Sequence, residues 1–158
     1  MIENEKISLI VPIFNEVNNV EPFFKNINNL NKKYINEIIF IDDGSSDDSN
    51  KKLNECIDAY KITDQNKETS FLVLKNLKNR GYGFSLKKGI KNSLNNLNAI
   101  IDLDLSYGIN DLNKLSEFMV NNSQDFDFVI GKRKIDETNT KFIKRIGKAL
   151  VNKITNIV

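Results

Sequence analysis

The chain has 158 residues, of which 40% are hydrophobic and 28% charged, and its formal net charge is +2. This balance is typical of a folded domain rather than a disordered chain, and no apolar run approaches the roughly 18 residues of a membrane-spanning helix. The sequence has no His, which excludes Ser-His and Cys-His catalysis and metal sites built on His. The single Cys56 excludes an internal disulfide, and with a start unlike a signal peptide it predicts a cytoplasmic protein.

Five short apolar segments predict strands, and each is followed by a segment with helical spacing. The predicted strands are residues 7–14, 37–41, 70–74, 99–103 and 126–131, and the predicted helices are 20–30, 47–60, 83–97, 111–120 and 140–157. Strands that alternate with helices favour an α/β fold with a mainly parallel sheet and helices on both faces. Ligands of such sheets bind beyond the carboxyl ends of the strands, so the loops after the strands form the candidate site.

The loop after the second predicted strand reads IDDGSSDDS, residues 41–49. A turn followed by a helix with Ser46 as its N-cap explains residues 44–49. Asp42 still belongs to the strand end, where its carboxylate could accept hydrogen bonds from a base or a ribose. The pattern alone leaves both interpretations of Asp42 open.

The loop after the third predicted strand contains NRGYGFSLKKG, residues 79–89. Its glycines lack the spacing and the Gly-Lys-Ser/Thr ending of a P-loop. They are compatible with a flexible turn or with a loop whose backbone a nucleotide sugar can approach.

The sequence IIDLDLS, residues 100–106, places Asp102 and Asp104 at the end of the fourth predicted strand. Alternate residues of a strand point to the same side, so the two carboxylates would repel each other unless a cation lay between them. Mg²⁺ and Mn²⁺ prefer such oxygen ligands and take further ligands from phosphates and water. The pattern favours a metal site over a solvated strand end.

Together, VPIFNE, IIFIDDGSSDDS, NRGYG, IIDLDLS and VIGKR resemble the GT-A family 2 glycosyltransferases, above all those that transfer sugars to dolichyl or polyprenyl phosphate. The resemblance implies a Rossmann-like nucleotide-diphospho-sugar transferase fold, a UDP- or GDP-linked sugar donor, and Mg²⁺ or Mn²⁺ bound by Asp102 and Asp104. It implies catalytic roles for Asp104 and Arg133, and contact of Arg133 with phosphate. We expect Arg133 and Arg145 to hold the acceptor phosphate. The nucleotide sugar would contact Pro12, Phe14, Asn15, Glu16, Asp42, Asp43, Arg80, Gly81 and Asp102.

The charge is unevenly distributed along the chain. Residues 132–158 carry eight Lys or Arg and two acidic residues, whereas residues 1–131 have a net charge of −4. Within the tail, residues 140–158 predict a basic amphipathic helix, which either lies on an anionic membrane or packs on the core with a solvated basic side. We expect a protein peripheral to the cytoplasmic face of the membrane, with a lipid phosphate acceptor and no nucleic-acid partner.

These observations lead to one main hypothesis, the metal-dependent inverting transfer of a sugar from a nucleotide diphosphate to polyprenyl or dolichyl phosphate. One alternative is a non-catalytic module that binds a nucleotide sugar or a partner, and a second is a nucleotidyltransferase. Because the family's sequences continue past the basic helix, we expect the single catalytic domain over residues 1–158 to be incomplete at its C-terminus.

Overall fold

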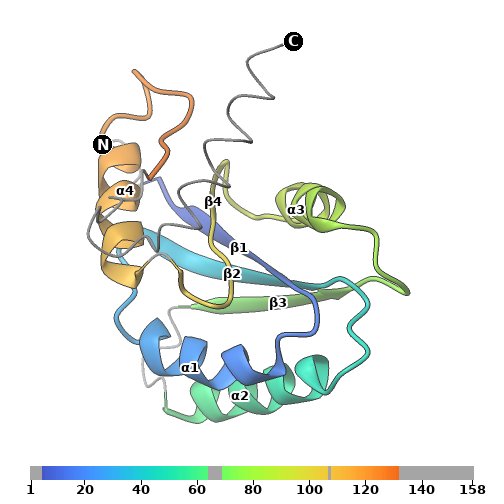
Figure 1. Ribbon diagram of the computed structural model, residues 1–158. Helices are drawn as coiled ribbons and strands as arrows, with labels where there is room; N and C mark the ends of the chain where they lie inside the picture. The colour runs from blue at the N-terminus through green and yellow to red at the C-terminus, as the bar shows by residue number, and fades with distance from the viewer. Residues whose placement is uncertain (1–4, 64–68, 107, 132–158) are drawn as a thin grey trace, which may run out of the picture.

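The computed structural model describes residues 5–63, 69–106 and 108–131. Four strands form one sheet in the order β3-β2-β1-β4, and all three pairings are parallel (Figure 1). Their bounds are Ile7–Ile13 for β1, Ile35–Asp42 for β2, Ser70–Lys75 for β3 and Leu97–Ile100 for β4. The predicted α/β class with a mainly parallel sheet is confirmed.

Helices cover both faces of the sheet, as the sequence predicts, but unequally. One face carries α1 (Val17–Ile27), α2 (Ser49–Thr63) and α4 (Ile109–Asn121), and the other carries α3 (Tyr82–Lys91) (Figure 1). No helix in these described ranges is long and apolar enough to cross a membrane. The predicted helix at 140–157 lies outside the described residues.

The main core lies between the sheet and the pair α1–α2. Alternation along β1 sends Leu9 and Val11 into it, and aromatic rings from the strands and both helices pack there with centroids 5.3–6.3 Å apart. The core on the α3 face is small and centres on three buried isoleucines. Gly89 brings α3 close to the sheet, because a Cβ there would lie 2.7 Å from the side chain of Ile10. The two faces therefore differ greatly in how much apolar surface they bury.

The helix predicted for residues 83–97 ends earlier, at Lys91. The side chains of Asn92 and Ser93 donate hydrogen bonds to the carbonyl oxygens of Lys88 and Ile90, each at 2.8 Å. Such local bonds satisfy carbonyls that another helical turn would otherwise use. The chain then turns and enters β4.

The strand predicted for residues 126–131 is wrong, because this segment has no regular secondary structure. Its apolar side chains are not buried either, since Phe126, Phe128 and Ile130 are 47%, 73% and 77% exposed. A short apolar segment alone does not make a strand, since the backbone also needs a neighbouring strand to pair with. Among the described residues none pairs with this segment.

Candidate functional site

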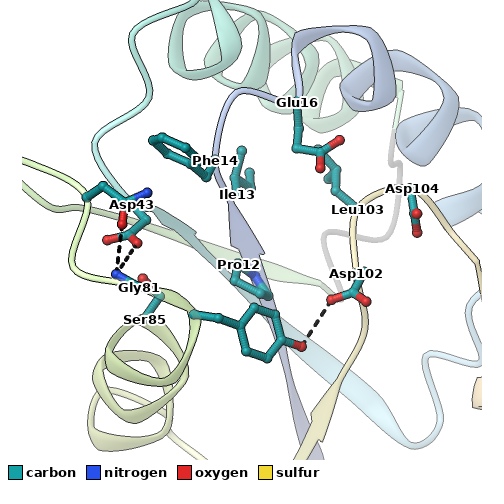
Figure 2. A pocket seen from close by; sticks show the side chains of 12 residues that line it. Pro12, Ile13, Phe14, Glu16, Asp43, Gly81, Ser85, Asp102, Leu103 and Asp104 are labelled. Carbon is teal, nitrogen blue, oxygen red and sulfur yellow. Dashed lines mark hydrogen bonds between the residues drawn. The ribbon is translucent and has the colours of Figure 1, made fainter. Parts of the chain in front are cut away.

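A cleft of about 380 Å³ lies at the carboxyl ends of the strands (Figure 2). Four segments line it: the end of β1, the loop after β2, the start of α3 and the loop after β4. The end of β1 contributes Pro12, Ile13, Phe14 and Glu16, and the loop after β2 contributes Asp43. The start of α3 and the loop before it contribute Asn79, Gly81, Tyr82 and Ser85, and the loop after β4 contributes Asp102, Leu103 and Asp104. The cleft occupies the edge of the sheet at which the sequence places the candidate site.

The loop after β4 begins earlier than the sequence predicts, because β4 ends at Ile100. The ladder between β1 and β4 continues only to a hydrogen bond from Ile101 N to Ile10 O, at 3.2 Å. In a parallel ladder the next bond would come from the backbone N–H of Pro12, and proline has none. The prediction that the two aspartates belong to a strand is therefore wrong.

A tight turn instead presents the two carboxylates on either side of a buried side chain. Leu103 is 2% exposed and packs into the main core, which fixes the middle of the turn. Leu105 has a φ of 53°, which is uncommon for a residue other than glycine, and its N–H donates to Asp102 O at 3.2 Å. The Asp104 carboxylate accepts hydrogen bonds from Ser106 N (2.8 Å) and Ser106 Oγ (2.6 Å). Asp102 and Asp104 thus line the cleft from one turn.

Asp43 lies across the cleft from this turn (Figure 2). Asp43 is 4% exposed, and its carboxylate accepts three hydrogen bonds, from Asn76 Nδ2 (2.6 Å), Arg80 N (2.9 Å) and Gly81 N (2.7 Å). Burial raises the pKa of Asp43, but the hydrogen bonds from Asn76 and from the two backbone N–H groups outweigh it and hold the pKa below its ordinary value. Asp43 is therefore an ionised carboxylate that holds the loop before α3 in place.

Gly44 lets the loop after β2 pack against the loop before α3. Its φ is +75°, and a Cβ there would lie 2.6 Å from the backbone carbon of Lys78 and 2.8 Å from the backbone nitrogen of Asn79. Any other residue would need a strained backbone and would displace the neighbouring chain. The sequence predicts a turn here but not this close approach.

Two of the residues that the resemblance assigned to the nucleotide, Asp42 and Asn15, do not line the cleft. Asp42 is fully buried; its Oδ1 accepts the N–H of Ser45 at 2.8 Å, and its Oδ2 lies 3.8 Å from Lys75 Nζ. Asn15 has a φ of 56°, and its Oδ1 accepts the N–H of Ser46 at 2.9 Å. Both side chains hold the loop after β2, so their predicted contacts with a nucleotide stay predictions.

Asp47 connects the beginnings of two helices. Its carboxylate accepts the N–H of Ser49 (3.0 Å), where α2 begins, and the N–H of Val17 (3.2 Å), where α1 begins. The predicted N-cap Ser46 is wrong, since Ser46 Oγ donates instead to Asn15 at 3.3 Å. A carboxylate suits this place, because the first N–H groups of a helix have no partner within the helix.

The sequence analysis missed Tyr82, whose hydroxyl donates to Asp102 Oδ1 at 3.0 Å (dashed in Figure 2). It also missed Asn79 and Ser85, which line the same side of the cleft. All three lie within the glycine-containing motif at 79–89. The polar side chains of that motif were the feature that could have revealed them.

The predicted arginines are only partly described. Arg80 donates its backbone N–H to Asp43, while its guanidinium lies 4.3 Å from the centre of the Phe84 ring and does not line the cleft. Arg133 and Arg145 lie outside the described residues. Of the other predicted site residues, those that line the cleft are Pro12, Phe14, Glu16, Asp43, Gly81, Asp102 and Asp104.

The donor set of the cleft fits a cation that brings further ligands with it. Asp102 and Asp104 supply carboxylates from one turn, whereas the described residues contain no cluster of three or more acidic, Cys or His side chains suited to a metal. Mg²⁺ commonly binds in this way, through one or two carboxylates together with phosphate oxygens and water. A bound diphosphate could complete such a site.

Comparison with known proteins identifies the family. The model of glycosyl transferase family 2 matches residues 8–156. The chain belongs to glycosyl transferase family 2. Its fold is the GT-A fold. A solved structure with this fold is the mannosyltransferase PcManGT from Pyrobaculum calidifontis in complex with GDP-Man and Mn²⁺. The two superpose with a TM-score of 0.62 over 75% of this chain and 33% of that one, at 16% sequence identity.

Two curated relatives of this family 2 chain are named for lipid phosphates. The dolichol-phosphate mannosyltransferase of Pyrococcus furiosus is 29% identical over 128 residues, which cover 81% of this chain and 33% of that protein. The dolichyl-phosphate beta-glucosyltransferase of Dictyostelium discoideum is 30% identical over 140 residues, which cover 84% and 41%. The chain therefore spans well under half the length of these two relatives.

Proposed function

We propose that the cleft binds a nucleotide diphosphate sugar together with Mg²⁺ or Mn²⁺, and that the chain belongs to an enzyme that transfers the sugar, with inversion, to a polyprenyl or dolichyl phosphate. The observation that carries the proposal is that Asp102 and Asp104 line the same cleft as Asp43, at the carboxyl ends of parallel strands. Membership in glycosyl transferase family 2 supports the reaction class. The two curated relatives support a lipid phosphate acceptor, and PcManGT supports a sugar nucleotide with a divalent cation.

The side chains of the cleft divide into two groups. Asp102 and Asp104 would hold the cation, which would neutralise the charge that develops on the leaving diphosphate. Tyr82 donates to one oxygen of Asp102 and so orients this carboxylate. On the β1 side, Phe14 is 44% exposed and offers a ring face to a base.

The acceptor explains how transfer proceeds without His. A hydroxyl acceptor would need a general base, whereas a phosphate monoester, with a second pKa of about 6, is already an oxyanion near neutral pH. The chain then has to bring donor and acceptor together and balance their charge. We propose that Arg133 and Arg145, which lie outside the described residues, hold the acceptor phosphate.

Calorimetric titration of UDP and GDP tests the donor and metal part of the proposal. Binding should be tight with Mn²⁺ and weak with EDTA, and Asp104→Asn should abolish the difference between the two conditions. The control Asp58→Asn makes the same chemical change on an exposed position of α2 and should behave as the wild type. Equal affinity of wild type in Mn²⁺ and EDTA would contradict a metal at Asp102 and Asp104.

A product assay separates the reaction classes. The protein is incubated with Mn²⁺, a sugar nucleotide and polyprenyl phosphate. A glycosyltransferase releases a nucleoside diphosphate and forms a glycolipid, a nucleotidyltransferase releases pyrophosphate, and a binding module releases neither. Family membership favours the first outcome, and pyrophosphate would overturn the proposal.

A further inference from the structure

The segment from residue 69 to residue 101 has a single sign of charge. It contains six Lys or Arg and no Asp or Glu, so all 21 acidic residues of the chain lie outside it. The segment covers β3, α3, β4 and the loops between them. It therefore carries +6 in a chain whose net charge is only +2.

The outer face of α3 combines this charge with exposed apolar side chains. Ser85 and Gly89 are buried and face the sheet, so helical spacing turns the positions on the opposite side to solvent. Phe84 and Ile90 on that side are 40% and 45% exposed. The exposed residues of the outer face are Phe84, Lys87, Ile90 and Lys91.

Two exposed leucines flank α3 in the chain. Leu77 precedes α3 and Leu94 follows it, and they are 105% and 79% exposed. Together with the four residues of the outer face they make up what we call the α3 surface. These exposed side chains belong to α3 and the residues that flank it, and α3 is the one described helix on its face of the sheet (Figure 1).

The combination of Lys and apolar side chains fits the headgroup region of an anionic membrane. Lys side chains attract anionic lipids while apolar side chains enter the boundary with the acyl chains. Charge opposes two other occupants, because residues 132–158 carry +6 and a second copy would present the same basic face. We propose that the α3 surface docks on an anionic membrane.

Docking through this surface would place the helix that borders the cleft at the membrane. Tyr82 and Ser85, in the first turn of α3, line the cleft, so the cleft and the α3 surface share one helix. The reason for such an arrangement rests on the proposed function, which requires a lipid phosphate acceptor. Vesicle binding is measured without nucleotide, metal or acceptor. The membrane proposal can therefore be wrong while the proposed function is right, and the proposed function can be wrong while the protein still binds vesicles.

The test is co-sedimentation of the full chain with vesicles of phosphatidylcholine and phosphatidylglycerol. The double variant Lys87→Glu, Lys91→Glu should bind about 30-fold more weakly than wild type, because each basic residue near an anionic surface contributes roughly a factor of five or more. The control Lys51→Glu, Lys61→Glu changes the net charge equally on exposed positions of α2 and should retain most of the affinity. Circular dichroism melts confirm that each variant is folded.

The apolar part is tested at high salt, where attraction between charges is screened. The double variant Ile90→Ser, Leu94→Ser should then release vesicles that the wild type still binds. Equal losses in the two charge variants would show a net-charge effect and overturn the proposal, as would unchanged binding of the Lys87→Glu, Lys91→Glu protein. Binding to soluble polyglutamate is measured as well. If the Lys87→Glu, Lys91→Glu substitutions weakened binding to polyglutamate more than binding to vesicles, the surface would be assigned to an acidic polypeptide instead.

Discussion

The carboxylates on the two sides of the cleft differ in what holds them. Asp43 is buried, and three donors of the protein surround its carboxylate. Asp102 and Asp104 protrude from a turn, where a Tyr hydroxyl and a nearby Ser are their donors. The first arrangement organises the fold, while the second places two carboxylates on the lining of the cleft, where we propose that a cation binds. Side chains of the same chemistry at one sheet edge thus have separable roles, which substitutions can tell apart.

The largest expected effect is on stability, from Asp43→Ala. Removing the carboxylate leaves its three donors without their acceptor, and we expect a loss of about 3 kcal/mol in the free energy of unfolding. Urea unfolding measures it. Asp58→Ala on an exposed position of α2 should change stability by less than about 0.5 kcal/mol. If Asp43→Ala were as stable as wild type, the structural role of Asp43 would be wrong.

The stability of wild type and of Asp43→Ala should depend differently on pH. Because hydrogen bonds hold the folded pKa of Asp43 below its ordinary value, the carboxylate stabilises the fold fully above the unfolded pKa of about 3.9. That contribution is lost as the pH falls through the folded pKa. The stability difference between wild type and Asp43→Ala should therefore be constant from neutral pH to about pH 5 and shrink below about pH 4. A difference that grew in acid would contradict the assigned ionisation.

Gly44→Ala should cost about 2 kcal/mol of stability, because the left-handed backbone and the close approach to Lys78 both exclude a Cβ. Gly83→Ala is the matched control. Gly83 lies within α3 and has no atom within 4 Å of a built Cβ, so alanine there should raise stability by roughly 0.5–1 kcal/mol. Thermal melts of both variants should therefore shift in opposite directions.

The smallest expected effect is on nucleotide binding, with no change in stability. Tyr82→Phe removes the hydroxyl that orients Asp102, and we expect Mn²⁺-dependent UDP or GDP binding to weaken by roughly threefold to tenfold, equivalent to a hydrogen bond of about 1 kcal/mol. The melting temperature should hardly change, because Tyr82 is 54% exposed.

The matched control is Tyr34→Phe. The Tyr34 hydroxyl also bonds to a carboxylate, Glu117 at 3.1 Å, but Tyr34 is 3% exposed, and the pair lies outside the cleft lining. This variant should lose about 1 kcal/mol of stability and keep its nucleotide affinity. If both variants affected binding equally, a specific role of Tyr82 would be excluded.

Much of the fold could be predicted from the sequence, because the pattern of buried residues determines it. The apolar residues of β1 and β2 and the helical spacing of Val20, Phe23, Phe24 and Ile27 gave the correct elements. The predicted ends of helices and strands were wrong where a single side chain determines where the element ends. Pro12 ends the pairing of β4 from the neighbouring strand, which a reading of β4's own residues could not anticipate.

The sequence predicted where the candidate site lies, but not the contacts among its side chains. The sequence placed Asp43, Asp102 and Asp104 at one edge, because the carboxyl ends of parallel strands meet there. It could not show that Asp42 faces inward, or that Tyr82 reaches Asp102 across 20 positions of the chain. Such contacts depend on how loops pack against each other, and neither periodicity nor residue type reveals that.

The donors of Asp43 have a consequence for how the sequence can vary. Two of the three, at Arg80 and Gly81, are backbone N–H groups, which every amino acid except proline supplies. Position 80 can therefore exchange its side chain freely without disturbing Asp43. A saturation library scored for folding would accept nearly any residue at position 80 and reject proline, so a contact essential to the architecture would leave almost no trace in the identity of the residue that makes it.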